Sequence, residues 1–288
     1  MQQRSIAGVR VSAIGLGGMP MSIEGRPDRG RSIATIHAAL DAGVTLIDTA
    51  DAYHLLAGEV GHNESLIAEA LSSYGGDTSD VLVATKGGHL RPGDGSWTVN
   101  GSPDYLKSAV EESLKRLGVE AIGLYQFHRP DPKVPYGDSV GAIRDLLDAG
   151  KIRLAGISNA NPQQIRQAQE ILGGRLASVQ NQFSPAFRSS EPELELCAAE
   201  GIAFLPWSPL GGIARAGDVG NRFEPFRRIA QEHGVSPQRV TLAWELAKAP
   251  QVIPIPGASR PETIRDSVQA VDLQLTREEL DQLDAAVG

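Results

Sequence analysis

Short runs of apolar residues recur along the chain, and each is followed by a polar loop and then by a segment with helical periodicity. Between positions 33 and 44, for example, apolar side chains are spaced as on one face of an amphipathic helix. Eight apolar runs have the length of buried strands, namely residues 11–17, 44–48, 81–86, 122–128, 153–158, 178–183, 202–207 and 252–256. The pattern therefore predicts eight successive β-α units.

Three of the predicted helices have recognisable first residues. Ser102, Asn161 and Ser236 are each followed by proline, and all three can accept an N–H from the start of a helix. Gln164 stands three residues after Asn161, where it can complete a capping box. Gly118 is placed to end the helix that begins after Ser102. These signals support the alternation of strands and helices.

The repeated units predict an α/β fold, a single closed (β/α)8 TIM barrel over residues 1–288, with a short N-terminal segment before it or at its bottom. No linker, charge run or low-complexity segment divides the units. The alternative is a doubly wound open sheet, which would carry G-x-G-x-x-G at a strand-to-helix turn. The stretch "GLGGMP" (15–20) resembles such a loop but lacks its spacing, so we favour the barrel.

Composition and charge limit the classes of binding partner that the protein can have. The chain has 27 basic and 35 acidic residues, a net charge of −8, which argues against nucleic acid or an anionic membrane as main partner. Cys197 is the only cysteine, so neither an intrachain disulfide nor a cysteine-based zinc cluster can form, and we expect no metal. No export signal or membrane-spanning run is evident. We expect a cytoplasmic protein, a monomer or a small homo-oligomer.

Ionisable side chains collect where successive predicted strands end. Asp48, Lys86 and His128 close the second, third and fourth strands, and Tyr53 follows Asp48 in the next loop. In a (β/α)8 barrel these strand ends meet on the open face that carries the chemistry. Each residue alone has an ordinary explanation, such as a turn-capping aspartate or a solvent-facing lysine. Four together are harder to explain by sheet stability.

The combination of these four groups indicates acid catalysis on a carbonyl. A buried lysine beside Tyr53 would lower the phenol's pKa from near 10, and Asp48 would keep that lysine charged. A neutral His128 could donate a hydrogen bond to a substrate oxygen as negative charge develops there. Such a set protonates a carbonyl oxygen while another group attacks the carbonyl carbon. The sequence offers no obvious nucleophile or metal cluster, so the attacking group is inferred to be a hydride source.

Seven motifs resemble those of the aldo-keto reductases, bacterial members in particular, over essentially the whole chain. They are "LIDTADAY" (46–53), "VATK" (83–86), "YQFHRPDP" (125–132), "GISN" (156–159), "VQNQF" (179–183), "WSPLGG" (207–212) and "IPIPGAS" (253–259). The resemblance implies NADP-dependent carbonyl reduction, with a catalytic tetrad of Asp48, Lys86, His128 and the general acid Tyr53.

The resemblance also implies a site for a nicotinamide cofactor. Residues that would hold it, from the nicotinamide to the adenosine end, are Ser158, Asn159, Gln180, Trp207, Ser208, Leu210, Gly257, Ser259, Arg260 and Asp266. The best-known mammalian pattern has basic residues at the positions of Gly257 and Thr263, so recognition of a 2′-phosphate would fall to Arg260. We therefore expect NADPH as cofactor, with NADH also possible.

Loops on the catalytic face would shape the substrate pocket. They offer four candidate substrate contacts, His54, Trp97, Arg129 and Arg188, and few large apolar side chains. This mixture favours a small polar carbonyl compound, such as a sugar, a pyridoxal-like aldehyde or a small keto compound.

Other functions remain open at the level of sequence. The same residues could work mainly in reverse, as an alcohol or sugar dehydrogenase. A cofactor-binding sensor or regulatory subunit with little turnover is a second alternative, although an intact tetrad argues against it. A Schiff-base aldolase using Lys86 would fit the fold but not the remaining motifs.

Overall fold

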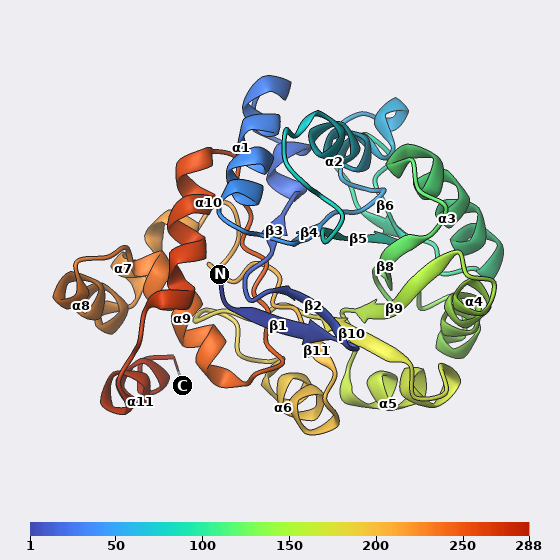
Figure 1. Cartoon of the computed structure of the whole chain (residues 1–288). Coiled ribbons are helices and arrows are strands. Elements are labelled where there is room, and N and C mark those ends of the chain that lie inside the picture. Colours follow the sequence, from blue (N-terminus) through green and yellow to red (C-terminus); the bar gives the residue numbers. More distant parts are fainter. Residues whose placement is uncertain (288) are drawn as a thin grey trace.

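The computed structural model describes residues 1–287 and shows a curled sheet of seven parallel strands surrounded by helices (Figure 1). In their order around the sheet the strands are β3 (Leu16–Gly17), β4 (Leu46–Asp48), β5 (Leu82–Gly87), β8 (Ile122–Phe127), β9 (Ile152–Ser158), β10 (Leu176–Gln180) and β11 (Ala203–Phe204). Each strand pairs with the strand that precedes it around the sheet, as a (β/α)8 barrel requires.

The eighth position is filled by residues 252–257, which close the barrel without forming a regular strand. Isolated parallel bridges join this segment to both neighbours, Phe204 to Val252 and Gly17 to Gly257. Pro254 and Pro256 have no N–H to donate, so a continuous ladder cannot form there. Their carbonyl oxygens still accept hydrogen bonds from the β3 side, each at 2.9 Å. The predicted barrel is confirmed, with its last strand irregular.

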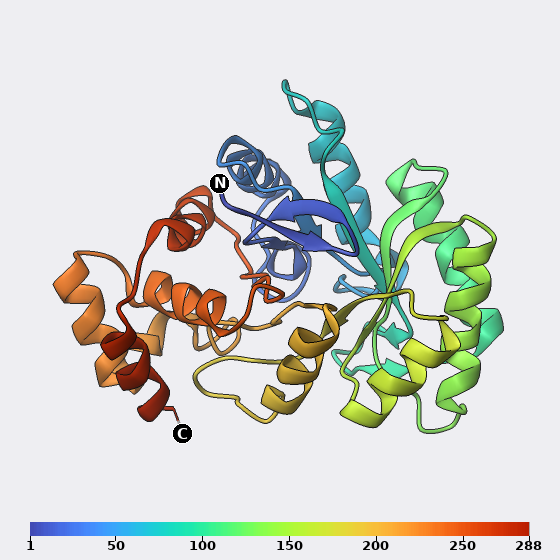
Figure 2. The ribbon, with the colours of Figure 1, turned by 60° about the horizontal axis from the view of Figure 1, so that its bottom comes forward.

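Eight helices follow the eight barrel positions and form the outer layer (Figure 1). They are α1 (Arg29–Asp41), α2 (His62–Ser73), α3 (Pro103–Leu117), α4 (Tyr136–Asp148), α5 (Pro162–Ile171), α6 (Glu191–Glu200), α9 (Pro237–Lys248) and α10 (Pro261–Val268). Three further helices, α7 (Val219–Arg222), α8 (Glu224–His233) and α11 (Arg277–Ala285), gather beside α9 on one side of the barrel (Figures 1 and 2).

The predicted helix signals act as expected. Ser102, Asn161 and Ser236 each accept a hydrogen bond from the N–H three residues further on. Gln164 completes the capping box with Asn161. Gly118 ends α3 at a φ of 67°, in the left-handed region that glycine adopts without strain.

The first predicted strand, residues 11–17, is wrong in its extent. Only β3 belongs to the barrel, whereas β2 (Val9–Ser12) pairs with β1 (Gln3–Ile6) in an antiparallel hairpin. This hairpin crosses the bottom of the barrel, seen facing the viewer in Figure 1, and its fully buried Ile6 and Val11 join the apolar side chains of the barrel interior. The N-terminal segment expected at the barrel bottom is therefore this hairpin.

The glycines of "GLGGMP" serve close packing at the closure of the barrel. A Cβ on Gly17 would lie 2.8 Å from the carbonyl oxygen of Ile255, and one on Gly18 would lie 2.5 Å from Oδ1 of Asn63. Any larger residue would push the closing segment or α2 away from β3. These glycines therefore let the chain pass closely at the barrel mouth.

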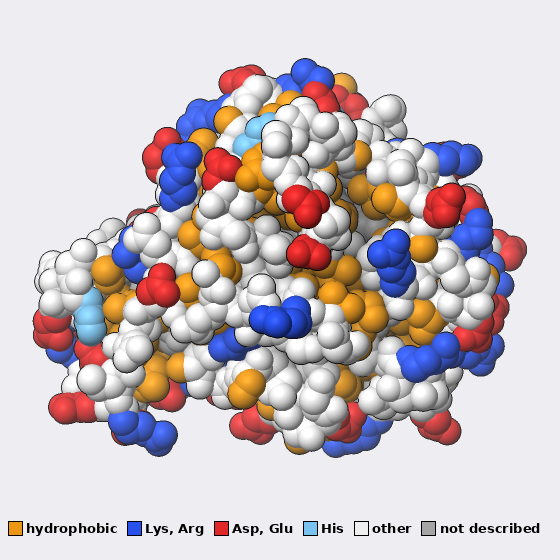
Figure 3. All heavy atoms as spheres, in the orientation of Figure 1, with side chains coloured by type: hydrophobic (Ala, Val, Ile, Leu, Met, Phe, Trp, Pro, Cys, Tyr) orange, Lys and Arg blue, Asp and Glu red, His pale blue; other side chains and the backbone are white. Residues whose placement is uncertain are grey.

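Two apolar layers stabilise the barrel, one inside it and a larger one between the sheet and the helices. The face in Figure 3 shows basic and acidic side chains interspersed around apolar patches. Within residues 1–287 no helix is long and apolar enough to cross a membrane. Cys197 is buried with a free thiol.

Candidate active site

The ends of three adjacent strands bring the predicted tetrad together. Asp48 ends β4, Lys86 lies near the end of β5, and His128 directly follows β8. Tyr53 returns over them from the loop after β4. Its hydroxyl lies 3.1 Å from Nζ of Lys86, and its ring meets the His128 ring edge-on with centroids 5.8 Å apart. Residues up to 80 positions apart in sequence thus form one cluster.

Lys86 is completely buried, and its ammonium group has a full set of acceptors. Nζ donates to Oδ1 of Asp48 at 2.6 Å, to the carbonyl oxygen of Thr49 at 2.8 Å and to the Tyr53 hydroxyl oxygen at 3.1 Å. An ammonium has three protons, so none is left for another partner. Burial by itself lowers the pKa of Lys86, but Asp48 and Tyr53 together outweigh it through their charges and hydrogen bonds, and the pKa is raised. Lys86 is therefore a cation.

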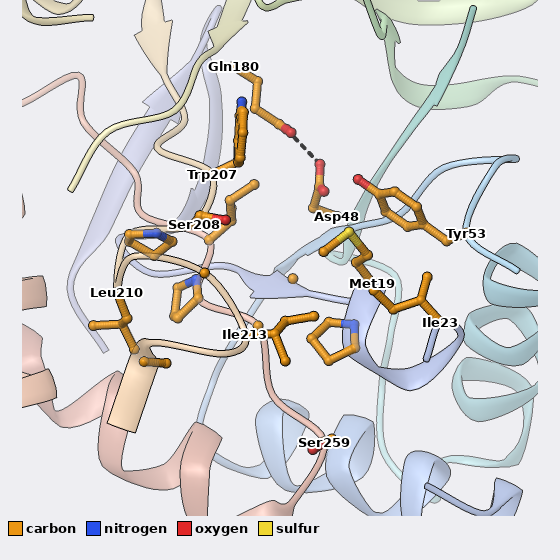
Figure 4. Close-up of a pocket in the computed structure, with 18 of the residues that line it drawn as sticks. Met19, Ile23, Asp48, Tyr53, Gln180, Trp207, Ser208, Leu210, Ile213 and Ser259 are labelled. Carbon is orange, nitrogen blue, oxygen red and sulfur yellow. Dashed lines mark hydrogen bonds between the residues drawn. The ribbon is translucent and has the colours of Figure 1, made fainter. Parts of the chain in front are cut away.

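Polar side chains from the barrel interior hold Asp48. Gln180 donates from Nε2 to Oδ2 of Asp48 at 2.7 Å, the contact drawn in Figure 4. Gln126 approaches the same oxygen at 3.5 Å and accepts a hydrogen bond from Ser178 at 3.2 Å. These contacts could not be predicted from the sequence, because the side chains lie within strands that consist mainly of apolar residues.

Tyr53 has a higher pKa than the sequence analysis expected. Burial raises the pKa of its hydroxyl, and Lys86 lowers it by a smaller amount, so the net change is upward. The expected lowering by Lys86 is present but does not prevail. In this state Tyr53 is a protonated phenol at neutral pH.

His128 is a neutral imidazole, as expected. Burial lowers its pKa well below the ordinary value, and the positive charge of Lys86 lowers it further. Nδ1 of the His128 ring is buried without a hydrogen-bond partner. The backbone carbonyl oxygen of His128 accepts a hydrogen bond from Nδ2 of Asn159 at 3.0 Å. The ring is therefore uncharged.

A cavity of about 600 Å³ extends from the tetrad toward the start of α10 (Figure 4). Lys86 lies behind this cavity. Fourteen of the predicted site residues line it: Asp48, Tyr53, Trp97, His128, Arg129, Ser158, Asn159, Gln180, Trp207, Ser208, Leu210, Gly257, Ser259 and Arg260.

Two of the four predicted substrate residues do not line the cavity. His54 is buried and its Nδ1 contacts the carbonyl oxygen of Leu56 at 2.8 Å. Arg188 forms an ion pair with Glu191 and lies against the ring of Trp244, outside the barrel. Their loops fold back onto local partners, so both side chains are already engaged.

Asp266 also lies away from the cavity. Its carboxylate pairs with Arg239 and accepts a hydrogen bond from Ser236, which ties α10 to the start of α9. Asp266 does not line the cavity. Its predicted place beside the adenosine has no support in this arrangement.

The cavity wall includes residues that the sequence analysis passed over, among them Met19, Ile23, Glu24 and His89. His89 begins β6 (His89–Leu90), which pairs with β7 (Thr98–Val99) in a short hairpin. The pairing places His89 in a stack on Trp97, with ring centroids 4.6 Å apart. In the sequence, only the position of this loop after β5 indicates that His89 could line the cavity.

The remaining cavity residues fit a dinucleotide. At one end Trp207 presents its ring beside Gln180 (Figure 4), with its Nε1 buried and without a partner. Asn159 lines the same cavity. Asn159 and Ser208 have positive φ values of 56° and 52°, a left-handed conformation that is uncommon for residues other than glycine and that clusters at binding sites.

At the other end of the cavity, Ser259, Arg260 and Thr263 surround the start of α10. No side chain caps this helix, so its first N–H groups are available to an anion. A flat ring surface with amides at one end and a cation with a helix N-terminus at the other suit a nicotinamide and a phosphate, respectively.

Comparison with known proteins identifies the family. The sequence pattern of the aldo/keto reductase family matches residues 13–287. An uncharacterised oxidoreductase of Schizosaccharomyces pombe is 35% identical over 280 residues, 95% of this chain and 86% of the yeast protein. The 6-dehydroglucose reductase of Novosphingobium aromaticivorans is 32% identical over 288 residues, 96% of this chain and 92% of that protein.

A solved structure agrees with these matches. The glycerol dehydrogenase of Gluconobacter oxydans has a TM-score of 0.83 and 27% identity, over 99% of this chain and 94% of that chain. The chain therefore belongs to the aldo/keto reductase family of NAD(P)-dependent oxidoreductases.

Proposed function

We propose that the protein reduces an aldehyde or ketone to an alcohol with NADPH, and that Tyr53 is the general acid. One observation carries the proposal. The Lys86 ammonium donates its hydrogen bond to the Tyr53 oxygen, so the phenolic proton is not used within the cluster. Because Tyr53 lines the cavity, it can give that proton to a carbonyl oxygen bound there.

A reduced nicotinamide, when bound, supplies the hydride that attacks the carbonyl carbon. The raised pKa of Tyr53 keeps its proton in place until substrate binds. After transfer, the cation of Lys86 stabilises the phenolate, and Asp48 keeps Lys86 charged. The neutral His128 ring gives the substrate oxygen a hydrogen bond as its negative charge grows.

Recognition of NADPH would rest mainly on Arg260. This arginine lines the far end of the cavity with Ser259, beside the uncapped start of α10. A guanidinium and a helix N-terminus both favour a phosphate group. We assign the 2′-phosphate to this position, and NADH remains an alternative cofactor.

The substrate is a small polar carbonyl compound. Relatives named for 6-dehydroglucose reduction and for glycerol dehydrogenation support such a class, and the second also supports the oxidative direction as an alternative function. A Schiff-base aldolase is disfavoured, because Lys86 is buried behind the cavity with all three ammonium protons engaged.

The test is an assay of NADPH consumption with aldehydes, ketones and sugars, run on the wild type and on Tyr53→Phe. We expect turnover in the wild type and its loss in the variant, with the NADPH dissociation constant unchanged. Wild-type protein that binds NADPH but reduces nothing, even when alcohols are offered with NADP⁺, would favour a regulatory role instead.

A further inference from the structure

Four charged side chains line the cavity, and the two acids among them are already paired. Asp48 is bound to Lys86, and Glu24 forms an ion pair with the buried Arg91. The other two, Arg129 and Arg260, take part in no ion pair or side-chain hydrogen bond within the part of the chain that the structure describes. The cavity therefore holds two uncompensated positive charges.

These two arginines lie at different ends of the cavity. Arg129 directly follows His128, whereas Arg260 follows Ser259, which Figure 4 shows far from Tyr53. The charge of Arg129 reaches the catalytic groups, because it contributes to the lowered pKa values of His89 and His128. If Arg260 serves the cofactor, Arg129 is the free cation at the catalytic end.

The surroundings of Arg129 leave its charge poorly solvated. The side chain is half-buried, and its Nε is buried with no hydrogen-bond partner. Burial accordingly lowers the pKa of the guanidinium, although arginine still carries its charge. A desolvated cation without a partner is unfavourable, and a bound anion would relieve that penalty.

We propose that Arg129 binds an anionic group of the substrate, so that the preferred substrates are aldehydes or ketones that carry a carboxylate or a phosphate. This inference rests on the proposed reductase function and names its substrate class. A guanidinium forms two parallel hydrogen bonds with either group, which gives orientation as well as attraction. Neither cavity acid opposes such a ligand, because each is neutralised by its own partner.

A row of aromatic rings beside Arg129 supplies a largely apolar wall for the rest of the substrate. Tyr53 meets His128, His128 meets His89 at 4.9 Å between centroids, and His89 stacks on Trp97. The pKa of His89 is lowered to about 4, mainly by burial, so this wall is uncharged at neutral pH. The uncharged body of a substrate can pack against these rings while its charged end reaches Arg129.

The test compares substrates that differ only in charge. 4-Carboxybenzaldehyde is paired with its methyl ester, and glyceraldehyde 3-phosphate with glyceraldehyde, in the wild type and Arg129→Met. Arg153→Met is the matched control, since Arg153 is an exposed arginine near the start of β9, at the opposite end of the barrel. Arg129→Lys keeps the charge, so it should keep part of any preference.

We expect Arg129→Met to lower kcat/KM for the charged member of at least one pair by roughly tenfold or more, the effect of one lost charged hydrogen bond. The uncharged member should change by less than about threefold, and Arg153→Met should change neither. A larger loss with glyceraldehyde 3-phosphate would identify phosphate as the group, and a larger loss with 4-carboxybenzaldehyde would identify carboxylate.

Calorimetry of 4-methylbenzoate binding to the protein loaded with NADP⁺ provides a readout without turnover. We expect weaker binding in Arg129→Met than in Arg153→Met. Equal losses for charged and uncharged substrates, with unchanged 4-methylbenzoate binding, would overturn the proposal. If no carbonyl compound is reduced by any form, the proposed function fails, and the calorimetry alone decides the role of Arg129.

Discussion

The ammonium nitrogen of Lys86 lies 2.6 Å from Oδ1 of Asp48, in an ion pair that is almost entirely shielded from solvent. Removing two charges from water is unfavourable, and such a pair persists only when hydrogen bonds satisfy both partners. Here Thr49 and Tyr53 accept the remaining hydrogen bonds of the Lys86 ammonium, and Gln180 donates a hydrogen bond to the Asp48 carboxylate. The pair links the barrel interior to the proposed acid.

Breaking this pair should affect stability and turnover differently. Lys86→Met leaves the Asp48 charge buried alone, so we expect a loss of roughly 3–5 kcal/mol in the free energy of unfolding. The double variant Asp48→Asn/Lys86→Met should regain a large part of that loss, yet remain inactive. Urea denaturation and NADPH consumption measure the two effects. A double variant no more stable than Lys86→Met would show that the unpaired Asp48 charge is not what destabilises Lys86→Met.

The pH dependence of carbonyl reduction should not show a titration of His128. Its pKa is lowered well below the ordinary value and that of Tyr53 is raised, so neither group changes charge between pH 6 and 8. His128→Gln should lower kcat without changing the shape of the pH profile. A limb between pH 6 and 8 that is present in the wild type and absent from His128→Gln would show that His128 titrates there.

Asp51 should make the stability of the protein depend on pH. Its carboxyl group is buried, with Oδ1 unpartnered and Oδ2 accepting from Tyr105, and burial raises its pKa to about 7. A raised pKa stabilises the folded state at low pH, and this contribution is lost as pH rises from about 4 to about 7.

Asp51→Asn removes this titration. Relative to the wild type, the variant should gain roughly 2.5 kcal/mol in unfolding free energy between pH 5 and pH 8. The control is Asp94→Asn, because hydrogen bonds from Ser96 lower the pKa of this exposed carboxyl, which stays ionised over that range. Equal pH dependence in Asp51→Asn and the wild type would show that Asp51 is ionised throughout.

Arg260→Ala should weaken NADPH binding by roughly tenfold or more while changing NADH binding by less than about threefold, because only NADPH carries the 2′-phosphate. Arg265→Ala is the matched control, since Arg265 is exposed on the same helix and does not line the cavity. Fluorescence titration of both cofactors measures the dissociation constants. Equal weakening of the two would place Arg260 elsewhere along the cofactor.

Sequence patterns predicted the parts of the site that follow from strand register. Parallel strands in a barrel end at one face, so the positions of Asp48, Lys86 and His128 at successive strand ends were enough to bring them together. The N-terminal caps of α3, α5 and α9 could also be predicted from the sequence, because each depends on residues within one helical turn.

Features that depend on long-range packing were not predictable. The hairpin of β1 and β2 resembles a barrel strand in sequence, and only pairing shows that it crosses the barrel bottom. Arg129 and Arg188 both read as loop arginines. Arg188 pairs with Glu191, three residues further on, and lies against Trp244, whereas Arg129 has no partner among the described residues although Asp131 follows it by two residues. A nearby acid in the sequence is therefore not enough to predict which arginine is paired.

Isotope labelling of the hydride tests whether Tyr53 assists hydride transfer to the carbonyl carbon. NADPH carrying deuterium at both C4 positions of its nicotinamide is mixed with the wild type, or with Tyr53→Phe, and the best carbonyl substrate of the panel. Mass spectrometry of the alcohol should show one deuterium on the former carbonyl carbon with the wild type, and almost no product with the variant. Alcohol without that deuterium, or labelled product formed equally fast by Tyr53→Phe, would contradict hydride transfer assisted by Tyr53.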